Sequence, residues 1–239
     1  MLRCLFRANA NNNGIYLSAS YDHAKPILIK KSSATLSSIS RLKKEVEGNN
    51  WYSQISKQEL IADIIELPSY YSVNFYYVSG EKADYRDGYR TNHEFIEKAL
   101  KIYCKIWAQL SSNELVIHGD YSLDNLIFDK NNIVIIDWEH FSRINIPIGF
   151  DALNLIYEQL YFMLPNQRLD NEIIEHAKLM LENLSKLKCL DKIYWDKPLL
   201  TTRNYISSNA GIWGAQIQKL PIMKLTPLEV DEIDELLCL

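Results

Sequence analysis

Short runs of apolar residues, many of them β-branched or aromatic, recur through the first 80 residues of the chain. Runs of this kind that end at turn residues are typical of β-strands. We therefore expect strands at residues 2–7, 15–21, 26–31 and 71–78, and a further apolar run covers residues 61–67. Because only short turn-rich segments separate the first three strands, we expect those three to form an antiparallel meander.

One helix is predicted inside this β-rich part. A polar connection covers residues 32–40, and the helix extends from there to about residue 55. The sequence Gly48-Asn49-Asn50 lies within the predicted helix and lowers the helix propensity at that point.

A charged connector at residues 80–88 separates this part from a region whose apolar residues recur at helical spacing. The first helix of that region is predicted to begin at Thr91, which forms a capping-box pattern with Glu94. We therefore expect two domains, residues 1–80 and residues 81–239. The expected fold class is α+β, with a small antiparallel β-rich part that contains one helix and a second, mainly helical part.

A hairpin and a final helix complete the predicted elements. Apolar runs at residues 126–128 and 133–136 flank the turn sequence Asp129-Lys130-Asn131-Asn132, which indicates a hairpin. Thr226 and Glu229 form a second capping box, and it marks the start of the last helix.

Composition narrows the functional classes. Of the 239 residues, 47% are hydrophobic and 23% are charged, with a net charge of −4. A disordered chain has fewer apolar residues, and a general nucleic-acid binder carries a basic excess, so we expect neither. The four cysteines are scattered without metal-ligand spacing, which favours a reducing, cytoplasmic location. No apolar run reaches the ~18–20 residues of a membrane span.

Glycine is scarce, and this excludes the glycine-rich nucleotide sites. The chain has only 8 glycines and contains neither GxGxxG nor GxxxxGK[ST]. A nucleotide site in this protein must therefore bind phosphates by other means.

The residues best suited to chemistry lie on either side of the predicted hairpin. The sequence His118-Gly119-Asp120 is followed by Asn125, and Asp137 ends the apolar run after the hairpin. Phosphoryl transfer needs a carboxylate that orients the acceptor hydroxyl, and oxygen ligands that hold Mg²⁺ on the phosphates. Asp120, Asn125 and Asp137 are of these types, and the hairpin is expected to bring Asp137 back beside the other two.

The order and spacing of these residues resemble the protein-kinase-like superfamily, and within it the aminoglycoside phosphotransferase and choline kinase group. That group carries HGDxxxxN, and an Asp followed by Phe or Trp, where protein kinases carry HRDxxxxN and DFG. The resemblance implies a two-lobed kinase-like fold and the cofactors ATP and Mg²⁺. It also implies that Asp120 is the catalytic base, that Asn125 and Asp137 are magnesium ligands, and that His118 braces the loop.

The resemblance places nucleotide-binding residues in the first 80 residues. Kinases hold the α- and β-phosphates with a strand lysine that pairs with a helix glutamate. Lys30 is the preferred lysine, with Lys31 as the alternative. Glu47 is preferred over Glu45 because apolar residues follow it four and eight positions later on one helix face.

The strand at residues 71–78 resembles the strand that leads to the kinase hinge. By that likeness, adenine binds main-chain groups from Tyr76 to Val78, and residues 9–14 form the nucleotide loop. This loop lacks the glycines that cover the phosphates in protein kinases.

Two features favour a small-molecule acceptor over a peptide. Gly119 replaces the arginine that pairs with an activation-loop phosphate in many protein kinases, and only residues 138–150 separate Asp137 from Asp151. A peptide-docking segment needs more chain than this. Asp151 follows a loop with Pro and Gly, and by the same resemblance it is expected to cap the next helix and to anchor the loop.

The acceptor is expected to be a hydroxyl-bearing sugar, choline-like compound or aminoglycoside-like compound. The short second part and a resemblance to kinases of bacterial surface-polysaccharide loci favour a sugar or choline-like compound over an antibiotic. Glu139 and Glu158 are candidates to meet a cationic acceptor. Aromatic side chains that stack on a sugar or enclose an ammonium group are further candidates, namely Tyr157, Tyr161, Trp195, Tyr205 and Trp213.

Two other functions remain open at this point. A catalytically impaired kinase-fold binding or scaffold protein is the alternative, motivated by the glycine-poor nucleotide loop. A metal-dependent hydrolase that uses His118, Asp120 and Asp137 lacks further ligands at suitable spacing. The sequence leaves the choice of ATP or GTP open, and the oligomeric state is either monomer or homodimer.

Overall fold

The computed structural model describes residues 2–7, 14–110, 116–129, 132–143, 149–161, 171–185, 196–213, 217 and 220–237. The chain divides into two compact units. The first comprises Met1–Ser79 together with Ile136–Phe141, and the second comprises Gly80–Ile135 and Ser142–Leu239. The segment Ile136–Phe141 therefore belongs with the N-terminal part, which the hydrophobic pattern did not predict. The assignment of nucleotide binding to residues 1–80 and of catalysis to residues 81–239 stays a prediction.

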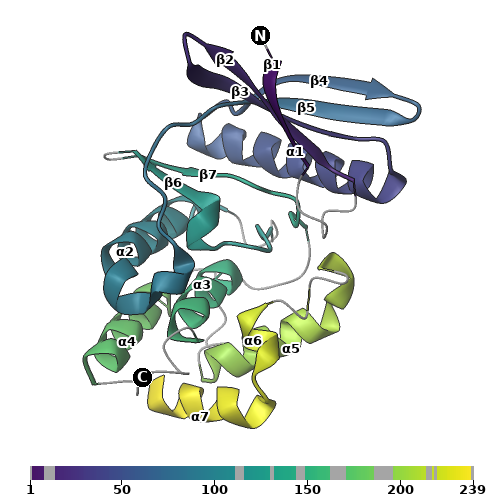
Figure 1. Ribbon diagram of the computed structural model, residues 1–239. Coiled ribbons are helices and arrows are strands. Elements are labelled where there is room, and N and C mark those ends of the chain that lie inside the picture. Colours follow the sequence, from purple (N-terminus) through teal and green to yellow (C-terminus); the bar gives the residue numbers. More distant parts are fainter. Residues whose placement is uncertain are drawn as a thin grey trace. The chain divides into compact units, whose positions relative to one another are not determined.

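The first unit is built on a five-stranded antiparallel sheet (Figure 1). Its strands are β1 (Leu2–Arg7), β2 (Tyr16–Asp22), β3 (Lys25–Ser33), β4 (Ile61–Leu67) and β5 (Tyr70–Tyr76). Their order across the sheet is β1-β2-β3-β5-β4, which confirms the predicted meander of the first three. The polar connection expected from residue 32 is wrong at its start, because Ser32 and Ser33 pair with Ser72 and Tyr71 and continue β3.

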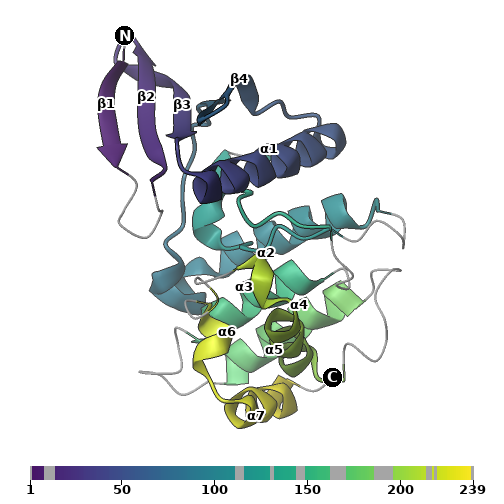
Figure 2. The ribbon, with the colours of Figure 1, turned by 90° about the vertical axis from the view of Figure 1, so that its right-hand side faces the viewer.

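Helix α1 (Leu36–Ser56) packs against one face of this sheet (Figure 2). Leu42 and Val46 of the helix share a core with Ile15, Tyr71, Val73 and Phe75. The helix begins about one turn before the predicted residue 40. It ends where Lys57 adopts a left-handed conformation with φ 62° and donates its N–H to Ser53 O at 3.0 Å.

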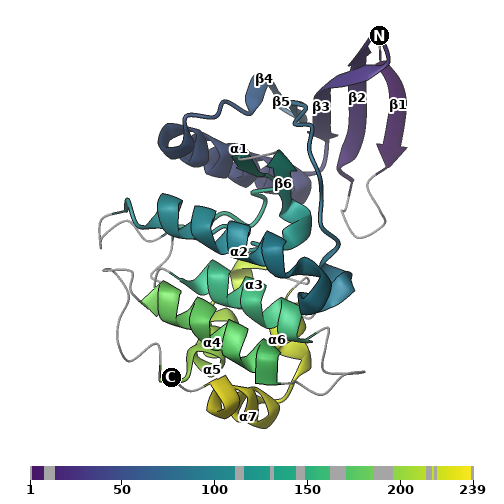
Figure 3. The same cartoon turned by 90° about the vertical axis from the view of Figure 1, so that its left-hand side faces the viewer.

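The second unit is mainly helical. Its helices are α2 (Gly88–Trp107), α3 (Phe150–Tyr161), α4 (Asn171–Ser185), α5 (Pro198–Ser208), α6 (Pro221–Lys224) and α7 (Pro227–Leu237). Helix α3 is buried along almost its whole length and contacts α2, α4, α5 and α6 (Figure 3). The predicted hairpin is present as β6 (Leu126–Asp129) and β7 (Asn132–Ile135). The predicted α+β class, a small antiparallel sheet with one helix and a mainly helical remainder, is confirmed.

The two predicted capping boxes have different outcomes. Thr226 and Glu229 form theirs, because Glu229 N–H donates to Thr226 Oγ1 at 3.3 Å and Thr226 N–H donates to Glu229 Oε2 at 2.7 Å. The box expected at Thr91 is wrong, since α2 begins earlier at Gly88. Gly88 has φ 76°, a value that suits glycine, and it turns the chain into the helix three residues before Thr91.

Of the helices that the structure describes, none combines the length and the hydrophobicity that crossing a bilayer requires.

Candidate functional site

The loop at residues 118–125 lies in the second unit and is held by a buried carboxylate. Asp151 accepts the backbone N–H of His118 at 2.8 Å and that of Gly119 at 2.9 Å. Gly119 has φ 84°, so the chain can turn there at little steric cost. Because α3 begins at Phe150, Asp151 lies in the first turn of the helix and the prediction that it caps the helix is wrong. The loop that it was predicted to anchor, before the helix, lies mostly outside the described residues, and the loop that Asp151 holds here is the one at 118–125.

Burial governs the electrostatics of Asp151. Its side chain is enclosed, and this burial raises the pKa of the carboxyl to about 7, although the two backbone donors pull it down. The negative charge of Asp120 adds to the increase.

Two further side chains fix the same loop from within the second unit. Trp213 donates its indole N–H to Gly119 O at 2.6 Å, and its ring lies 5.9 Å from that of Phe150. The buried ring of His118 accepts the Asp120 N–H through Nδ1 at 3.3 Å. The Trp213 side chain therefore supports the 118–125 loop. It is only 3% exposed, which is too little for its ring to enclose an acceptor.

Asp120 and Asn125 are joined directly. The Asn125 amide Nδ2 donates to the Asp120 backbone O at 2.8 Å and to its carboxylate Oδ2 at 3.1 Å. A single 3₁₀ turn, Leu123–Asn125, folds the chain back so that these side chains meet. Since both Nδ2 bonds go to Asp120, the polar atom of Asn125 that remains for a ligand is the carbonyl Oδ1, a hard oxygen suited to Mg²⁺.

Glu158 on α3 adds a second carboxylate to this region. Glu158 is 8% exposed, and its Oε2 is buried without a hydrogen-bond partner among the described residues. Desolvation raises the pKa of Glu158 well above its usual range, and the negative charges of Asp120 and Asp124 raise it further, while Lys224 lowers it. A cation placed beside Glu158 would compensate this cost.

The lysine–glutamate pair lies in the first unit and involves the alternative residues. Lys31 Nζ donates to Glu45 Oε1 at 2.6 Å and to Asp137 Oδ1 at 2.7 Å. Burial by itself lowers the pKa of Lys31, but the charges of Asp137 and Glu45 outweigh it and raise the pKa above the usual value. Lys31 is therefore a fixed positive charge at neutral pH.

The preference for Lys30 is corrected by the strand register. Lys31 lies opposite Val73, whose side chain faces α1, whereas Lys30 lies opposite Asn74 on the other side of the sheet. Lys30 Nζ is placed 5.7 Å from the ring centre of Tyr70.

The preference for Glu47 is corrected by the face of α1. Glu45 shares the buried face with Leu42 and Asn49, while Glu47 is exposed on the opposite side. The spacing of Leu42, Val46 and Asn49 around Glu45 was the signal that could have identified this face.

Asp137 adopts an unusual backbone conformation. Its φ of 63° lies in the left-handed region, which costs a non-glycine residue about 1–2 kcal/mol. The ion pair with Lys31 holds its carboxylate, and the side chain remains 39% exposed. The residue is thus held in a strained position with an accessible side chain, as at many functional sites.

The main-chain N–H groups of the predicted hinge residues differ in whether they have a hydrogen-bond partner. Tyr76 N–H donates to Leu60 O at 2.8 Å, and Tyr77 N–H donates to Ile27 O at 2.9 Å. Within the part of the chain that the structure describes, the Val78 N–H has no partner. Except for Gly14, the predicted nucleotide loop at residues 9–14 lies outside the described residues.

The remaining acceptor candidates are dispersed. Tyr157 is fully buried, and Tyr161 lies under Lys224, whose Nζ is 5.5 Å from the ring centre. Tyr205 is partly exposed, and Trp195 lies outside the described residues. Glu139 is bound to Arg41 in the first unit, so it is not available to an acceptor.

The predicted catalytic and metal residues are therefore distributed over both units. Asp120 and Asn125 form one group in the second unit, and Asp137 forms another with Lys31 in the first. That these groups act together stays a prediction. Among the described residues, no group of three or more His, Cys, Asp or Glu side chains is placed to hold a metal ion by itself.

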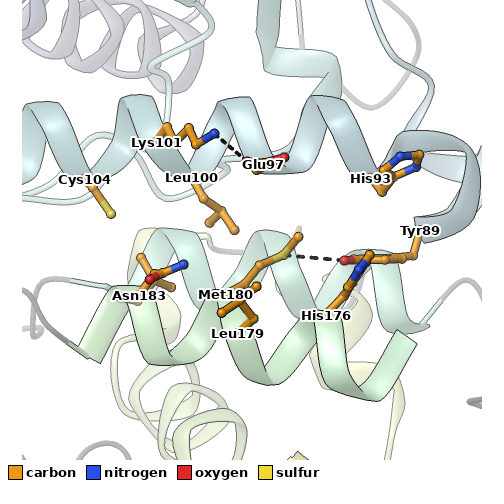
Figure 4. Close-up of a pocket in the computed structure, with 11 residues that line it drawn as sticks. Tyr89, His93, Glu97, Leu100, Lys101, Cys104, His176, Leu179, Met180 and Asn183 are labelled. Carbon is orange, nitrogen blue, oxygen red and sulfur yellow. Dashed lines mark hydrogen bonds and ion pairs between the residues drawn. The ribbon is translucent and has the colours of Figure 1, made fainter. Parts of the chain in front are cut away.

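A cavity of about 570 Å³ opens between α2 and α4 of the second unit (Figure 4). Its lining includes Tyr89, His93, Leu100, Cys104, His176 and Met180. Tyr89 OH and Met180 Sδ lie 3.9 Å apart across it, and Glu97 pairs with Lys101 at its edge. None of the residues predicted from the sequence lines this cavity, so it does not mark the candidate site.

Comparisons with known proteins show a phosphotransferase family and a similar fold. A family model described as "Phosphotransferase enzyme family" matches residues 39–157, a range that contains both the 118–125 loop and Asp137. A solved ternary complex of streptomycin, ATP and APH(2'')-IIa matches with a TM-score of 0.55 and 12% identity, covering 96% of this chain and 92% of that one. No curated protein matches the sequence. At this identity the structural likeness shows the fold, and it confirms the predicted kinase-like type.

Proposed function

The chain belongs to the phosphotransferase enzyme family, and on this basis we propose that it is a kinase that transfers phosphate from ATP, with Mg²⁺, to a hydroxyl group of a small molecule. The observation that carries the proposal is the Asp120–Asn125 pair on a loop held by Asp151. A base and a metal ligand joined in this way are the parts that phosphoryl transfer requires.

Asp120 is the proposed catalytic base. Its Oδ2 accepts the Asn125 amide, and this hydrogen bond orients the carboxylate that is proposed to take the proton of the acceptor hydroxyl. The Asp151 carboxylate and the Trp213 indole hold the backbone of the loop, so Asp120 is positioned without rearrangement.

Asn125 and Asp137 are the proposed magnesium ligands. Both supply hard oxygens, and the amide nitrogen of Asn125 is occupied, so its donor set fits Mg²⁺. Mg²⁺, when bound, neutralises charge on the transferred phosphoryl group. Asn125 and Asp137 would hold the ion, and Lys31 orients the Asp137 carboxylate for this role.

We propose Lys31 as the group that contacts the α- and β-phosphates, with Glu45 positioning it. The support is the buried ion pair, since a lysine whose charge is fixed and oriented binds phosphate without losing side-chain freedom at that step. The N–H of Val78, which has no partner among the described residues, is the proposed hydrogen-bond donor to adenine, and the carbonyl of Tyr76 is a further main-chain group proposed for the base.

The acceptor is proposed to carry a positive charge as well as a hydroxyl. Glu158 supports this, because its buried Oε2 lacks a partner within the described chain and its ionised form is costly in the free protein. An amine or quaternary ammonium group beside Glu158 would stabilise that ionised form. A choline-like or aminoglycoside-like compound fits this requirement, whereas a neutral sugar leaves the carboxylate unpaired.

An acceptor screen tests the proposal. Purified protein is incubated with ATP and Mg²⁺ and a panel of choline, ethanolamine, aminoglycosides and neutral sugars, and ADP release is measured. We expect turnover with a cationic member of the panel. Asp120→Ala is expected to abolish turnover without changing ATP affinity, while Asp129→Ala, at an exposed aspartate of the hairpin, leaves both unchanged. Equal activity of Asp120→Ala and the parent would refute the catalytic assignment.

ATP binding separates the kinase from the scaffold alternative. A ligand that binds only the folded state raises the melting temperature. We expect millimolar ATP with Mg²⁺ to do so here, and no shift would favour the catalytically impaired scaffold.

A further inference from the structure

The segment that carries Asp137 is packed onto helix α1 by aromatic side chains. The ring of Trp138 lies 5.5 Å from Trp51 and 5.5 Å from Tyr52, both on α1. Phe141 lies 5.9 Å from Trp51, and Trp138 is completely buried. These contacts explain why residues 136–141 group with the first unit.

Gly48 makes this close packing possible. A Cβ at this position would lie 2.6 Å from Trp138 Cβ and 2.9 Å from Phe141 Cβ. Both neighbours are the first atoms of buried side chains, so they cannot move aside without moving the backbone. The glycine that weakens the helix in the sequence is therefore the residue that lets α1 reach the segment.

An ion pair joins the same two elements beside the lysine–glutamate pair. Arg41 Nη2 lies 2.5 Å from Glu139 Oε1, and the side chains are 20% and 15% exposed. Arg41 is one helical turn before Glu45, and Glu139 is two residues after Asp137. Lys31 thus bridges Glu45 and Asp137, and Arg41 makes a parallel bridge from α1 to the same segment.

We propose that Arg41 and Gly48 are positioning residues, which hold the segment 136–141 against α1 so that the Asp137 carboxylate stays beside Lys31 and Glu45 before nucleotide binds. The left-handed backbone of Asp137 costs free energy, and contacts on both sides of it are needed to maintain it. In this arrangement α1 and the segment 136–141 form one body. The helix therefore does not have to move for the Lys31–Glu45 ion pair to form. The inference rests on the proposed function of Asp137.

The primary test measures the affinity for ATP with and without Mg²⁺ by titration calorimetry, together with KM for ATP and for the acceptor. Arg41→Gln is expected to weaken binding of ATP with Mg²⁺ by about tenfold. KM for the acceptor should not change, because the residue proposed to contact the acceptor, Glu158, lies on α3 and not on this segment. Arg41→Lys should recover part of the affinity. Arg86→Gln, which removes an exposed ion pair with Asp84, is the matched control and should bind as the parent does.

A double-mutant cycle shows whether Arg41 acts through Glu139. Glu139→Gln should weaken binding to a similar extent, and the double variant should be no worse than either single variant. Additive losses would overturn the role of this ion pair. Gly48→Ala is the independent probe, with Gly211→Ala as its control, because a Cβ at Gly211 meets no atom within 4 Å. Altered tryptophan fluorescence in Gly48→Ala alone would report displacement of Trp138.

The outcomes separate this inference from the proposed function. If the parent neither binds ATP nor turns over any acceptor, the proposed function fails. If the parent is active and Arg41→Gln and Glu139→Gln both bind ATP with Mg²⁺ as the parent does, the proposed function stands and the positioning role is refuted, whether or not Gly48→Ala folds.

Discussion

Removing the carboxylate of Asp151 should destabilise the protein strongly, because this side chain satisfies two buried backbone donors at once. It accepts the N–H groups of His118 and Gly119 at 2.8 and 2.9 Å and is 1% exposed. Asp151→Ala leaves both donors unpaired, at about 1–3 kcal/mol each. The expected loss of about 2–6 kcal/mol is a large part of the ~5–15 kcal/mol that stabilises a typical domain.

The loss of stability caused by Asp151→Ala should depend on pH in a defined direction. Burial raises the pKa of Asp151 from 3.8 to about 7, so the folded state binds this proton more tightly than the unfolded state. Stability from this group is therefore present at low pH and declines as pH rises through the window from about 4 to about 7, by about 1.4 kcal/mol per pKa unit. Because Asp151→Ala lacks this decline, the difference in unfolding free energy between parent and variant should be largest near the acid end of the window.

Urea unfolding followed by tryptophan fluorescence, at several pH values across this window, measures the difference. Asp129→Ala removes an exposed aspartate and serves as the control. The reasoning is refuted if Asp151→Ala unfolds within about 1 kcal/mol of the parent and follows the same pH dependence.

Three other substitutions test separate contacts in the second unit. Trp213→Phe keeps an aromatic ring but removes the donor to Gly119 O, so we expect about 1–3 kcal/mol less stability and slower turnover; a melting temperature equal to the parent's would contradict this. Thr226→Ala breaks the capping box with Glu229 and should cost about 1 kcal/mol in urea unfolding, whereas Thr226→Ser should not. Burial raises the pKa of Asp234 to about 6, so the parent should lose stability as pH rises from about 4 to 6. Asp234→Asn should lose less over that range, and identical pH profiles would argue against this effect.

Local sequence patterns predicted most of the secondary structure, because strands and hairpins leave a signal in neighbouring residues. The run at Ile61–Leu67, the meander of β1 to β3 and the β6–β7 hairpin follow from short apolar runs and the turns between them. Helix starts were less predictable. The box at Thr226 formed, but α2 began before Thr91 because Gly88 provided an earlier turn. A capping pattern shows that a helix can begin at a residue, and the surrounding chain decides where it does.

The sequence by itself determined which reactive groups were predicted for the candidate site, since the types and spacing of Asp120, Asn125 and Asp137 are properties of the chain alone. Only the tertiary structure decided which residues support those groups. Lys31 meets a carboxylate 106 positions away, and its selection over Lys30 depends on which face of β3 packs against α1.

The same holds for Gly48, which weakens a helix when judged locally and permits close packing when the segment 136–141 is present. Contacts between residues far apart in sequence leave no periodic signal, because their partners meet only after the strands and helices have packed. For this reason the reactive groups could be predicted from the sequence, whereas the residues that hold them in place could be identified only from the tertiary structure.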